Sequence, residues 1–162
     1  MSIDYLDLTK IKGISDYQFT PKITDILFEF KDNIKIEYSK STKKIKYVYE
    51  DGNLLLSFKP TNGFFTLSLL AAKKILAKTD QPLMRVVVLN EISEFIKEGR
   101  NVFCKHVIEM DPNLRPLDEV IVVNKDDELL AVGRLMIPVP YIKAFDSGVA
   151  IKVRKGILKS KI

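Results

Sequence analysis

Residues 148–155 read Gly-Val-Ala-Ile-Lys-Val-Arg-Lys, and this stretch decides how the second half of the chain folds. From Val149 to Val153 every second side chain is apolar, while Lys152 and Arg154 fall on alternate positions. A period of two is typical of a β-strand that buries one face and exposes the other. We therefore expect a closing strand whose outward face carries both cations.

Several strands and two short helices are predicted before this closing strand. Asn90 can cap a helix over Glu91–Glu98, which Gly99 ends, and a proline enters a second helix over Pro138–Phe145. A short helix between the first two strands, and another before the last, suggest a small, partly open barrel. The predicted strands are Met84–Leu89, Val102–Met110, Val120–Val123 and Leu129–Ile137, the last two joined by a hairpin loop over Asn124–Glu128.

The first eighty residues combine helical and strand patterns. Ile3–Gly13 has a roughly helical spacing of apolar residues and ends at a glycine. A second apolar stretch, Ile23–Phe30, follows Pro21, with Thr24 as a candidate cap. Strands are predicted over Ile34–Tyr38, Ile45–Tyr49 and Leu54–Phe58, with the hairpin turn Asp51-Gly52 before the third, and Phe64–Lys78 is a helix or a strand that runs into one.

These patterns predict a chain of the α+β class with two domains. The boundary is expected in the polar stretch from Lys78 to Pro82, because proline and short polar residues interrupt regular structure. The predicted domains are a small α+β domain over residues 1–80 and a β pseudo-barrel over residues 83–156, followed by a basic tail over residues 157–162.

The composition is that of a folded globular protein, with 46% apolar and 29% charged residues among 162. No apolar run reaches the roughly 18–20 residues of a membrane span, and the N-terminus lacks a basic-then-apolar signal pattern. We therefore expect a cytoplasmic protein with no membrane partner. The single cysteine excludes an internal disulfide and a cysteine-rich zinc site.

The charge balance favours a polyanionic partner, since 26 basic and 21 acidic residues give a net charge of +5. Every arginine lies after residue 80, and arginine offers a planar fork of donors that suits phosphate. A solvated, lysine-rich surface would give the same composition. Charge alone leaves these two interpretations equally open.

Few residues are candidates for catalysis. Cys104 and His106 would share a face of the predicted strand, so a dyad is conceivable, but their apolar neighbours favour a core position. The acidic run Asp126–Glu128 lies at a hairpin tip, where solvated charges are usual, and it lacks the spacing of a calcium loop. We therefore predict no catalytic residue, no metal site and no cofactor.

Four motifs of the second half are Gly99–Lys105, Arg115–Val120, Leu130–Arg134 and Gly148–Arg154. In this order and spacing they closely resemble a PUA domain, a small RNA-binding pseudo-barrel of RNA-modifying enzymes and translation proteins. The resemblance spans Met84–Lys155 and implies a PUA-type β pseudo-barrel. The chain departs from the family pattern at Leu117, where a glycine is usual, at Cys104, where alanine is common, and at Pro138 and Pro140.

The motifs of the first half are Ser15–Phe19, Ile45–Tyr49, Asp51–Leu55, Lys59-Pro60 and Gly63–Leu67. They resemble the domain that precedes the PUA domain in archaeosine tRNA-guanine transglycosylase, and archaeosine synthase is similar there. In those enzymes the pair follows a zinc-bearing catalytic barrel that exchanges a base in the D-loop of tRNA. The resemblance covers the C-terminal part only and implies a tRNA-binding half without the barrel.

The resemblance also implies a groove that grips the acceptor stem and 3′ end of tRNA. Glycines would let phosphates approach the main chain, and cations would contact phosphates and 2′-hydroxyls. An exposed ring would stack on an opened terminal base, although Phe64 and Phe65 are more typical of a core pair. The predicted RNA-binding residues are Gly99, Arg100, Lys105, Gly133, Arg134, Lys152, Arg154 and Phe64, whereas Arg115 beside Asp118 suits a surface ion pair.

Three functions follow from these observations. The first is a tRNA-binding accessory protein or subunit for archaeosine-type modification, partnered by a separate transglycosylase or archaeosine synthase catalytic subunit. The second is a ribosome- or translation-associated PUA protein that binds structured RNA, against which Asp16–Phe19 and Gly63–Leu67 argue. The third is a protein-interaction module that binds no RNA.

Overall fold

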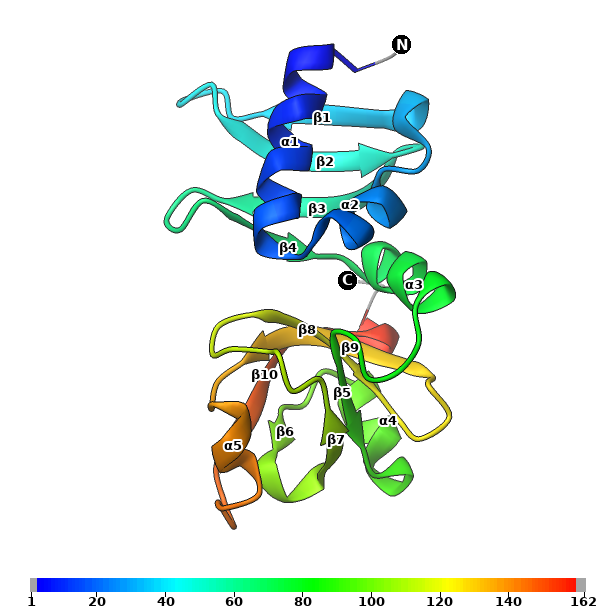
Figure 1. The fold of residues 1–162 in the computed structure, drawn as a ribbon, viewed down its shortest axis with the longest axis vertical. Coiled ribbons are helices and arrows are strands. Elements are labelled where there is room, and N and C mark those ends of the chain that lie inside the picture. Colours follow the sequence, from blue (N-terminus) through cyan, green and yellow to red (C-terminus); the bar gives the residue numbers. More distant parts are fainter. Residues whose placement is uncertain (1–2, 160–162) are drawn as a thin grey trace. The chain divides into compact units, whose positions relative to one another are not determined.

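The computed structural model describes residues 3–159, which form two compact units that divide between Lys78 and Thr79 (Figure 1). Helices and antiparallel strands occur in both units, so the predicted α+β class is confirmed. The first unit contains α1 (Tyr5–Gln18), α2 (Pro21–Leu27), β1 (Ile34–Tyr38), β2 (Ile45–Glu50), β3 (Asn53–Lys59), β4 (Phe64–Leu67) and α3 (Leu69–Lys78).

The first unit is an antiparallel meander in the order β1-β2-β3-β4 with helices on one face. Figure 1 shows α1 and α2 crossing in front of the strands. Helix α3 lies on the same face, where its Lys74 forms an ion pair with Glu50 of β2. Glu50 points to this face because it is paired across the strands with the buried Ile34. The strand side chains buried under these helices include Ile34, Val48, Leu56, Phe65 and Leu67.

Helix α1 is longer than the sequence predicted, because it continues through Gly13 to Gln18. A glycine ends a helix by entering the left-handed region, and Gly13 does not adopt a positive φ. The last turn is held by the Gln18 side chain, which donates to the Phe65 carbonyl and accepts from the Phe65 amide, both at 2.8 Å. The helix therefore ends where its side chain meets the free edge of β4.

Helix α2 is capped by Thr20, whereas the sequence predicted Thr24 as the cap. The Thr20 hydroxyl accepts a hydrogen bond from the Ile23 amide at 3.2 Å. Thr24 lies inside the helix, and its hydroxyl donates to the Ser15 hydroxyl at 2.7 Å. Thr24 therefore connects the two helices.

Replacing Gly13 with alanine is expected to raise the free energy of unfolding by about 0.5–1 kcal/mol. The glycine lies inside α1, and an added Cβ would meet no heavy atom within 4 Å. The substitution therefore reduces the freedom of the unfolded chain without a clash in the folded one. Urea titration followed by circular dichroism measures the change, and a lower midpoint would contradict this placement of Gly13.

The second unit is a six-stranded sheet in the order β6-β10-β9-β8-β5-β7, curled into a nearly closed barrel (Figure 1). β5 and β8 pair in parallel, and the other neighbours are antiparallel. Along residues 3–159 no helix has both the length and the apolar character needed to cross a membrane. The elements are β5 (Arg85–Val88), α4 (Ser93–Lys97), β6 (Val102–Phe103), β7 (Val107–Met110), β8 (Glu119–Val123), β9 (Leu129–Leu135), α5 (Val139–Ile142) and β10 (Val149–Gly156).

The strand predicted over Val102–Met110 is in fact two strands separated by a 3-10 turn. β6 ends at Phe103, the turn covers Cys104–His106, and β7 begins at Val107. β6 pairs with β10, whereas β7 pairs with β5, so the chain changes neighbour at this turn. Since β6 and β7 are the two edges of the sheet, the turn lies where the barrel fails to close.

Asn90 does not cap helix α4, which begins only at Ser93 after a 3-10 turn. The Asn90 side chain instead holds the loop between β8 and β9. It accepts from the Lys125 amide at 2.8 Å and donates to the Asp126 carboxylate at 3.3 Å. The helix ends at Gly99 as predicted, where φ is +102°.

Leu117 occupies a backbone position that suits glycine. Its φ is +75°, in the left-handed region that side chains with a Cβ rarely enter. Its amide donates to the Leu135 carbonyl at 2.7 Å, and this bond ties the turn to β9. This positive φ explains why the family pattern has glycine at this position, since glycine adopts the left-handed region without strain.

The position of Asp126–Glu128 at a hairpin tip predicted solvated side chains, but the structure gives each of the three acids a partner. Asp127 binds Arg85, Asp126 binds Asn90, and Glu128 binds Lys97 at 3.0 Å. The Lys97 ammonium is the main cause of the lowered pKa of the Glu128 carboxyl. The three acids therefore attach the hairpin to the rest of the barrel.

Arg85 is fully buried, with 0% of its surface exposed. Its Nε lies 2.8 Å from Oδ1 of Asp127, and its Nη2 lies 3.0 Å from Oδ2. The same guanidinium donates to the Thr79 hydroxyl at 2.8 Å and to the carbonyls of Thr79, Asp80 and Leu83. One of the arginines that suggested phosphate binding is therefore an internal structural group.

Candidate nucleic-acid interface

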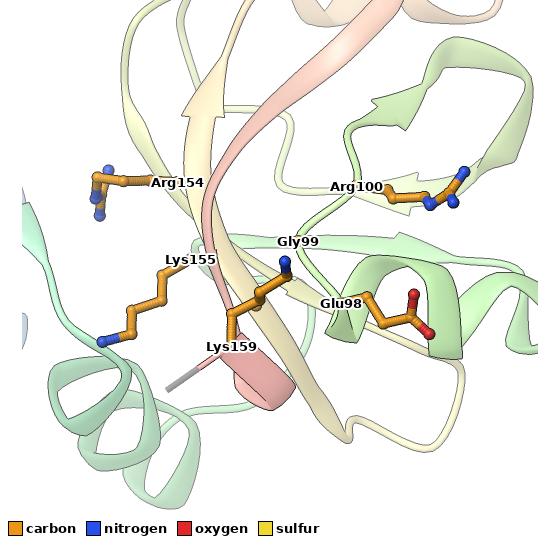
Figure 2. A pocket seen from close by; sticks show the side chains of 7 residues that line it. Glu98, Gly99, Arg100, Arg154, Lys155 and Lys159 are labelled. Carbon is orange, nitrogen blue, oxygen red and sulfur yellow. The ribbon is translucent and has the colours of Figure 1, made fainter. Parts of the chain in front are cut away.

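A cavity of about 680 Å³, here called the basic cavity, opens between the end of α4 and the end of β10 (Figure 2). Figure 2 shows Arg154 and Lys155 on one side, Arg100 pointing away on the other, and Lys159 reaching towards Gly99. Four lining side chains are cationic and one is acidic. The lining residues are Glu98, Gly99, Arg100, Arg154, Lys155, Gly156 and Lys159.

The basic cavity exists because β10 ends against the main chain that follows α4. A Cβ on Gly156 would lie 2.6 Å from the Gly99 nitrogen and still closer to the Lys97 carbonyl oxygen. No larger residue fits at position 156 unless the backbone moves. The contact places Arg100 and Lys155, the neighbours of these two glycines, at one site.

Most of the positive charge in the basic cavity is unbalanced. Among residues 3–159, Arg100, Lys155 and Lys159 form no ion pair. The Arg100 guanidinium lies 5.6 Å from the centre of the Phe95 ring, a cation–π contact that orients it while it stays exposed. Several cations in a concave site with one carboxylate, that of Glu98, attract an anion.

Arg154 differs from the other cations because it is paired with Glu119. Its Nη1 lies 3.0 Å from Oε2 and its Nη2 lies 2.6 Å from Oε1, which makes the pair bidentate. Glu119 is buried on β8, so the carboxylate needs this partner. Arg154 is therefore a charge-balanced lining residue, and its predicted contact with RNA phosphate stays a prediction.

Arg134 and Lys152 are exposed beside the pair. Pairing across β8, β9 and β10 aligns Glu119, Arg134 and Lys152 in one row, so their side chains share a face of the sheet. Arg134 and Lys152 form no ion pair among the residues that the structure describes. The outward position predicted for Lys152 agrees with its exposure.

The remaining two predicted residues of this unit lie elsewhere. Gly133 is buried, and a Cβ there would lie 2.5 Å from the Lys152 carbonyl oxygen. This glycine therefore allows β9 and β10 to pack closely, and its predicted contact with a phosphate stays a prediction. Lys105 is exposed in the turn Cys104–His106 and does not line the basic cavity.

Cys104 and His106 lie in a 3-10 turn, so the strand geometry imagined for a dyad is absent. Burial raises the pKa of the Cys104 thiol, the opposite of what a reactive thiolate needs. Burial, with the Lys105 charge, lowers the pKa of His106. Along residues 3–159 no group of three or more histidine, cysteine or acidic side chains could hold a metal ion.

In the first unit, the two neighbouring phenylalanines separate into core and surface. Phe65 is buried, whereas Phe64 is half-buried and stacks in parallel on Tyr17, with ring centres 6.0 Å apart and planes at 7°. Tyr17 is 81% exposed. Tyr17 is therefore the more accessible ring, and prediction from the sequence missed it.

Sequence reasoning also missed Lys155, Gly156 and Lys159 as site residues. Lys159 belonged to the predicted basic tail over residues 157–162, of which residues 160–162 lie outside the described residues, and Lys155 was only the last residue of the predicted closing strand. The signal that could have found the site is Gly156, which follows Arg154 and Lys155 at the end of the closing strand, since glycine in a strand often marks a close approach.

Comparison with known families assigns both units. Residues 9–82 match the patch-forming domain C2 of tRNA-guanine transglycosylase, and residues 84–157 match the PUA domain. Among curated relatives, tRNA-guanine(15) transglycosylase of Methanobrevibacter smithii is 43% identical over 153 residues, or 94% of this chain and 23% of the relative. That of Methanocaldococcus jannaschii is 40% identical over 156 residues, or 96% of this chain and 24% of the relative. The chain thus spans about a quarter of the length of these relatives.

Solved structures share the fold across both units. A hypothetical protein from Pyrococcus horikoshii has a TM-score of 0.74 and 21% identity, covering 96% of this chain and 93% of that one. A conserved PUA domain protein from Thermoplasma acidophilum has a TM-score of 0.66 and 15% identity, covering 95% and 91%. The resemblance seen in the motifs is confirmed: residues 9–82 belong to the family of C2 domains of tRNA-guanine transglycosylase, and residues 84–157 belong to the PUA family.

Proposed function

We propose that this chain binds tRNA through the basic cavity and acts as a tRNA-binding accessory protein or subunit in archaeosine-type tRNA modification. The observation that carries the proposal is the unbalanced charge of Arg100, Lys155 and Lys159 in a PUA domain. The C2 domain that precedes it along the chain, and the relatives named tRNA-guanine(15) transglycosylase, support tRNA as the RNA. The acceptor stem and 3′ end are the part of tRNA that we propose is held.

The binding chemistry follows from the arrangement of the cations. Three cations on the walls of one concave site can each contact a phosphate along a stem of A-form RNA. The exposed Arg134 and Lys152 extend the positive surface along β9 and β10. Donors from Arg100 can also reach 2′-hydroxyls, which distinguish RNA from DNA. The proposed role is therefore to position a folded RNA, while a transglycosylase or archaeosine synthase subunit performs the chemistry.

Reversing the charge of two cavity lysines tests the RNA-binding role. The wild-type chain should bind a tRNA transcript, and its affinity should fall by roughly 40-fold between 50 and 200 mM salt if about three phosphates are neutralised. Lys155→Glu/Lys159→Glu should weaken binding at least tenfold and flatten the salt dependence. Fluorescence anisotropy at the two salt concentrations measures both effects.

The matched control is Lys125→Glu/Lys143→Glu, which makes the same change in net charge at exposed lysines that do not line the basic cavity. It should bind tRNA within about threefold of wild type. Equal losses in both variants would mean that only net charge matters. Negligible binding by the wild type at both salt concentrations would favour a protein-interaction module instead.

The accessory role is tested separately by affinity capture with the full chain as bait. Recovery of a transglycosylase or archaeosine synthase polypeptide that lacks this domain pair would support it. Recovery of ribosomal subunits would favour the translation-associated alternative. RNA binding and the accessory role can therefore fail independently.

A further inference from the structure

The sheet of the first unit has a second face, here called the open sheet face, which carries rings and lysines. Side chains alternate along a strand, and paired residues point to the same side. Buried Val48 and Leu56 mark the helix-covered face, so their neighbours Tyr47 and Ser57 mark the other. The open sheet face comprises Lys35, Glu37, Tyr47, Tyr49, Ser57, Lys59, Phe64 and Thr66, all half-buried or exposed.

Two tyrosines occupy the middle of the open sheet face. The Tyr47 and Tyr49 rings are 6.0 Å apart, with planes at 59°. The Lys46 ammonium lies 5.2 Å from the centre of the Tyr47 ring. Glu37 lies across from Tyr47, and its charge adds to burial in raising the pKa of Tyr49 above its ordinary value.

A second aromatic group lies at the β4 edge of the same face. Phe64 is directly across from Lys59 on β3, so the ring and the ammonium share one side of the sheet. Tyr17 stacks in parallel on Phe64, and the neighbouring Gln18 holds this end of α1 by two hydrogen bonds to the β4 backbone. The stacked pair is thus built into the fold, with the Tyr17 ring largely exposed.

The charge around these rings is positive. Lys35, Lys46 and Lys59 lie on or over the open sheet face, and Glu37 is its acid. Rings with nearby lysines suit single-stranded nucleic acid, because bases stack on the rings while the phosphates meet the cations. Four-stranded sheets that present aromatic residues on an open face commonly stack two or three bases in this way.

We propose that the open sheet face binds a single-stranded segment of RNA, with bases stacked on Tyr47, Tyr49 and the Tyr17–Phe64 pair. This second contact differs from the basic cavity, which suits the phosphates of a stem. The open-face proposal rests on the proposed function only because it assumes that the ligand of the chain is RNA. The chain would then recognise an RNA that offers a stem to the second unit and unpaired nucleotides to the first.

An eight-nucleotide oligouridylate and a short RNA hairpin, each tested with the full chain, separate the two sites. The chain has six tyrosines and no tryptophan, and Tyr17, Tyr47 and Tyr49 belong to the proposed site, so base stacking there should quench part of the tyrosine emission. Oligouridylate should quench this emission and bind measurably at low salt. Tyr47→Leu/Tyr49→Leu should weaken oligouridylate binding at least tenfold and leave hairpin binding within about twofold.

Tyr5→Leu is the control, because Tyr5 is a highly exposed tyrosine on α1 that is not part of the open sheet face. It should bind oligouridylate like the wild type. If the double tyrosine variant unfolds, as judged by circular dichroism, Lys35→Glu/Lys59→Glu replaces it. This second variant should also lose at least tenfold in oligouridylate affinity.

The outcomes distinguish the two proposals. Unquenched tyrosine emission with wild type, or equal oligouridylate affinity in wild type and in the folded face variant, overturns the open-face proposal. Lys155→Glu/Lys159→Glu should lose hairpin binding and keep oligouridylate binding. If that variant keeps hairpin binding, the basic cavity is refuted while the open sheet face stands on its own result.

Discussion

Replacing Arg85 with methionine is expected to lower the free energy of unfolding by about 2–4 kcal/mol, because several hydrogen-bond acceptors lose their buried donor and a partly exposed carboxylate loses its partner. Asp127 would lose both hydrogen bonds from the guanidinium. The carbonyls of Thr79, Asp80 and Leu83 would lose a donor as well. Urea unfolding of the full chain, followed by circular dichroism, measures the loss.

The control for this prediction is Arg115→Met, which removes an exposed arginine of the same unit. We expect it to change the free energy of unfolding by no more than about 0.5 kcal/mol. Arg85→Met/Asp127→Asn should recover part of the loss, since it removes the unpaired charge as well. A loss in Arg85→Met no larger than in Arg115→Met would refute the role given to the buried contact.

The same contact makes stability depend on acid. Burial alone would raise the pKa of the Asp127 carboxyl, but hydrogen bonds from Arg85 and Gln81 and the arginine charge outweigh it, so the pKa lies below its ordinary 3.8. A carboxyl with a lowered pKa in the folded state adds stability above its unfolded value and loses it as pH falls through the folded one. Stability should therefore drop on acidification below about pH 4, and less steeply in Asp127→Asn.

Gly156→Ala is expected to destabilise the chain by about 3 kcal/mol and to weaken tRNA binding, because the added Cβ meets backbone atoms that cannot rotate away. It would lie 2.6 Å from the Gly99 nitrogen. The end of β10 would have to move from the segment after α4, and that movement separates Lys155 from Arg100. Urea unfolding and anisotropy with tRNA measure the two effects.

Gly13→Ala makes the same chemical change in open space and should act in the opposite direction on stability. It should leave tRNA affinity unchanged. If both alanine variants had similar stability, the close approach at Gly156 would not exist. If Gly156→Ala unfolds, a stable variant at the other side of the site, Arg100→Glu, still tests the cavity through its RNA affinity.

Much of the strand arrangement could be predicted from local patterns. Alternation over Ile34–Tyr38, Ile45–Tyr49 and the closing strand corresponds to β1, β2 and β10, and the Asp51-Gly52 turn joins β2 to β3. These features depend on neighbours within a few residues, so the sequence contains the needed information. The continuation of α1 past Gly13 could not be predicted, because the helix ends where Gln18 meets Phe65, a residue 47 positions away on β4.

The site was predicted less completely, for the same reason. Gly133 and Gly156 are both glycines in strands, and nothing local shows which main chain approaches each of them. The pairing of Arg154 with Glu119, 35 residues earlier, also depends on how the strands are aligned. The basic character of the end of the chain was visible, whereas the partners that neutralise or leave free each cation were not.

Strand pairing within the second unit also sets an order for folding during synthesis. The meander of the first unit joins strands that follow one another, so it can form while later residues are still being made. β10 pairs with both β6 and β9 and is the last strand translated among those described. The pseudo-barrel must therefore wait for its final strand to leave the ribosome, and a nascent chain stalled before residue 149 would expose the apolar groups that β10 covers.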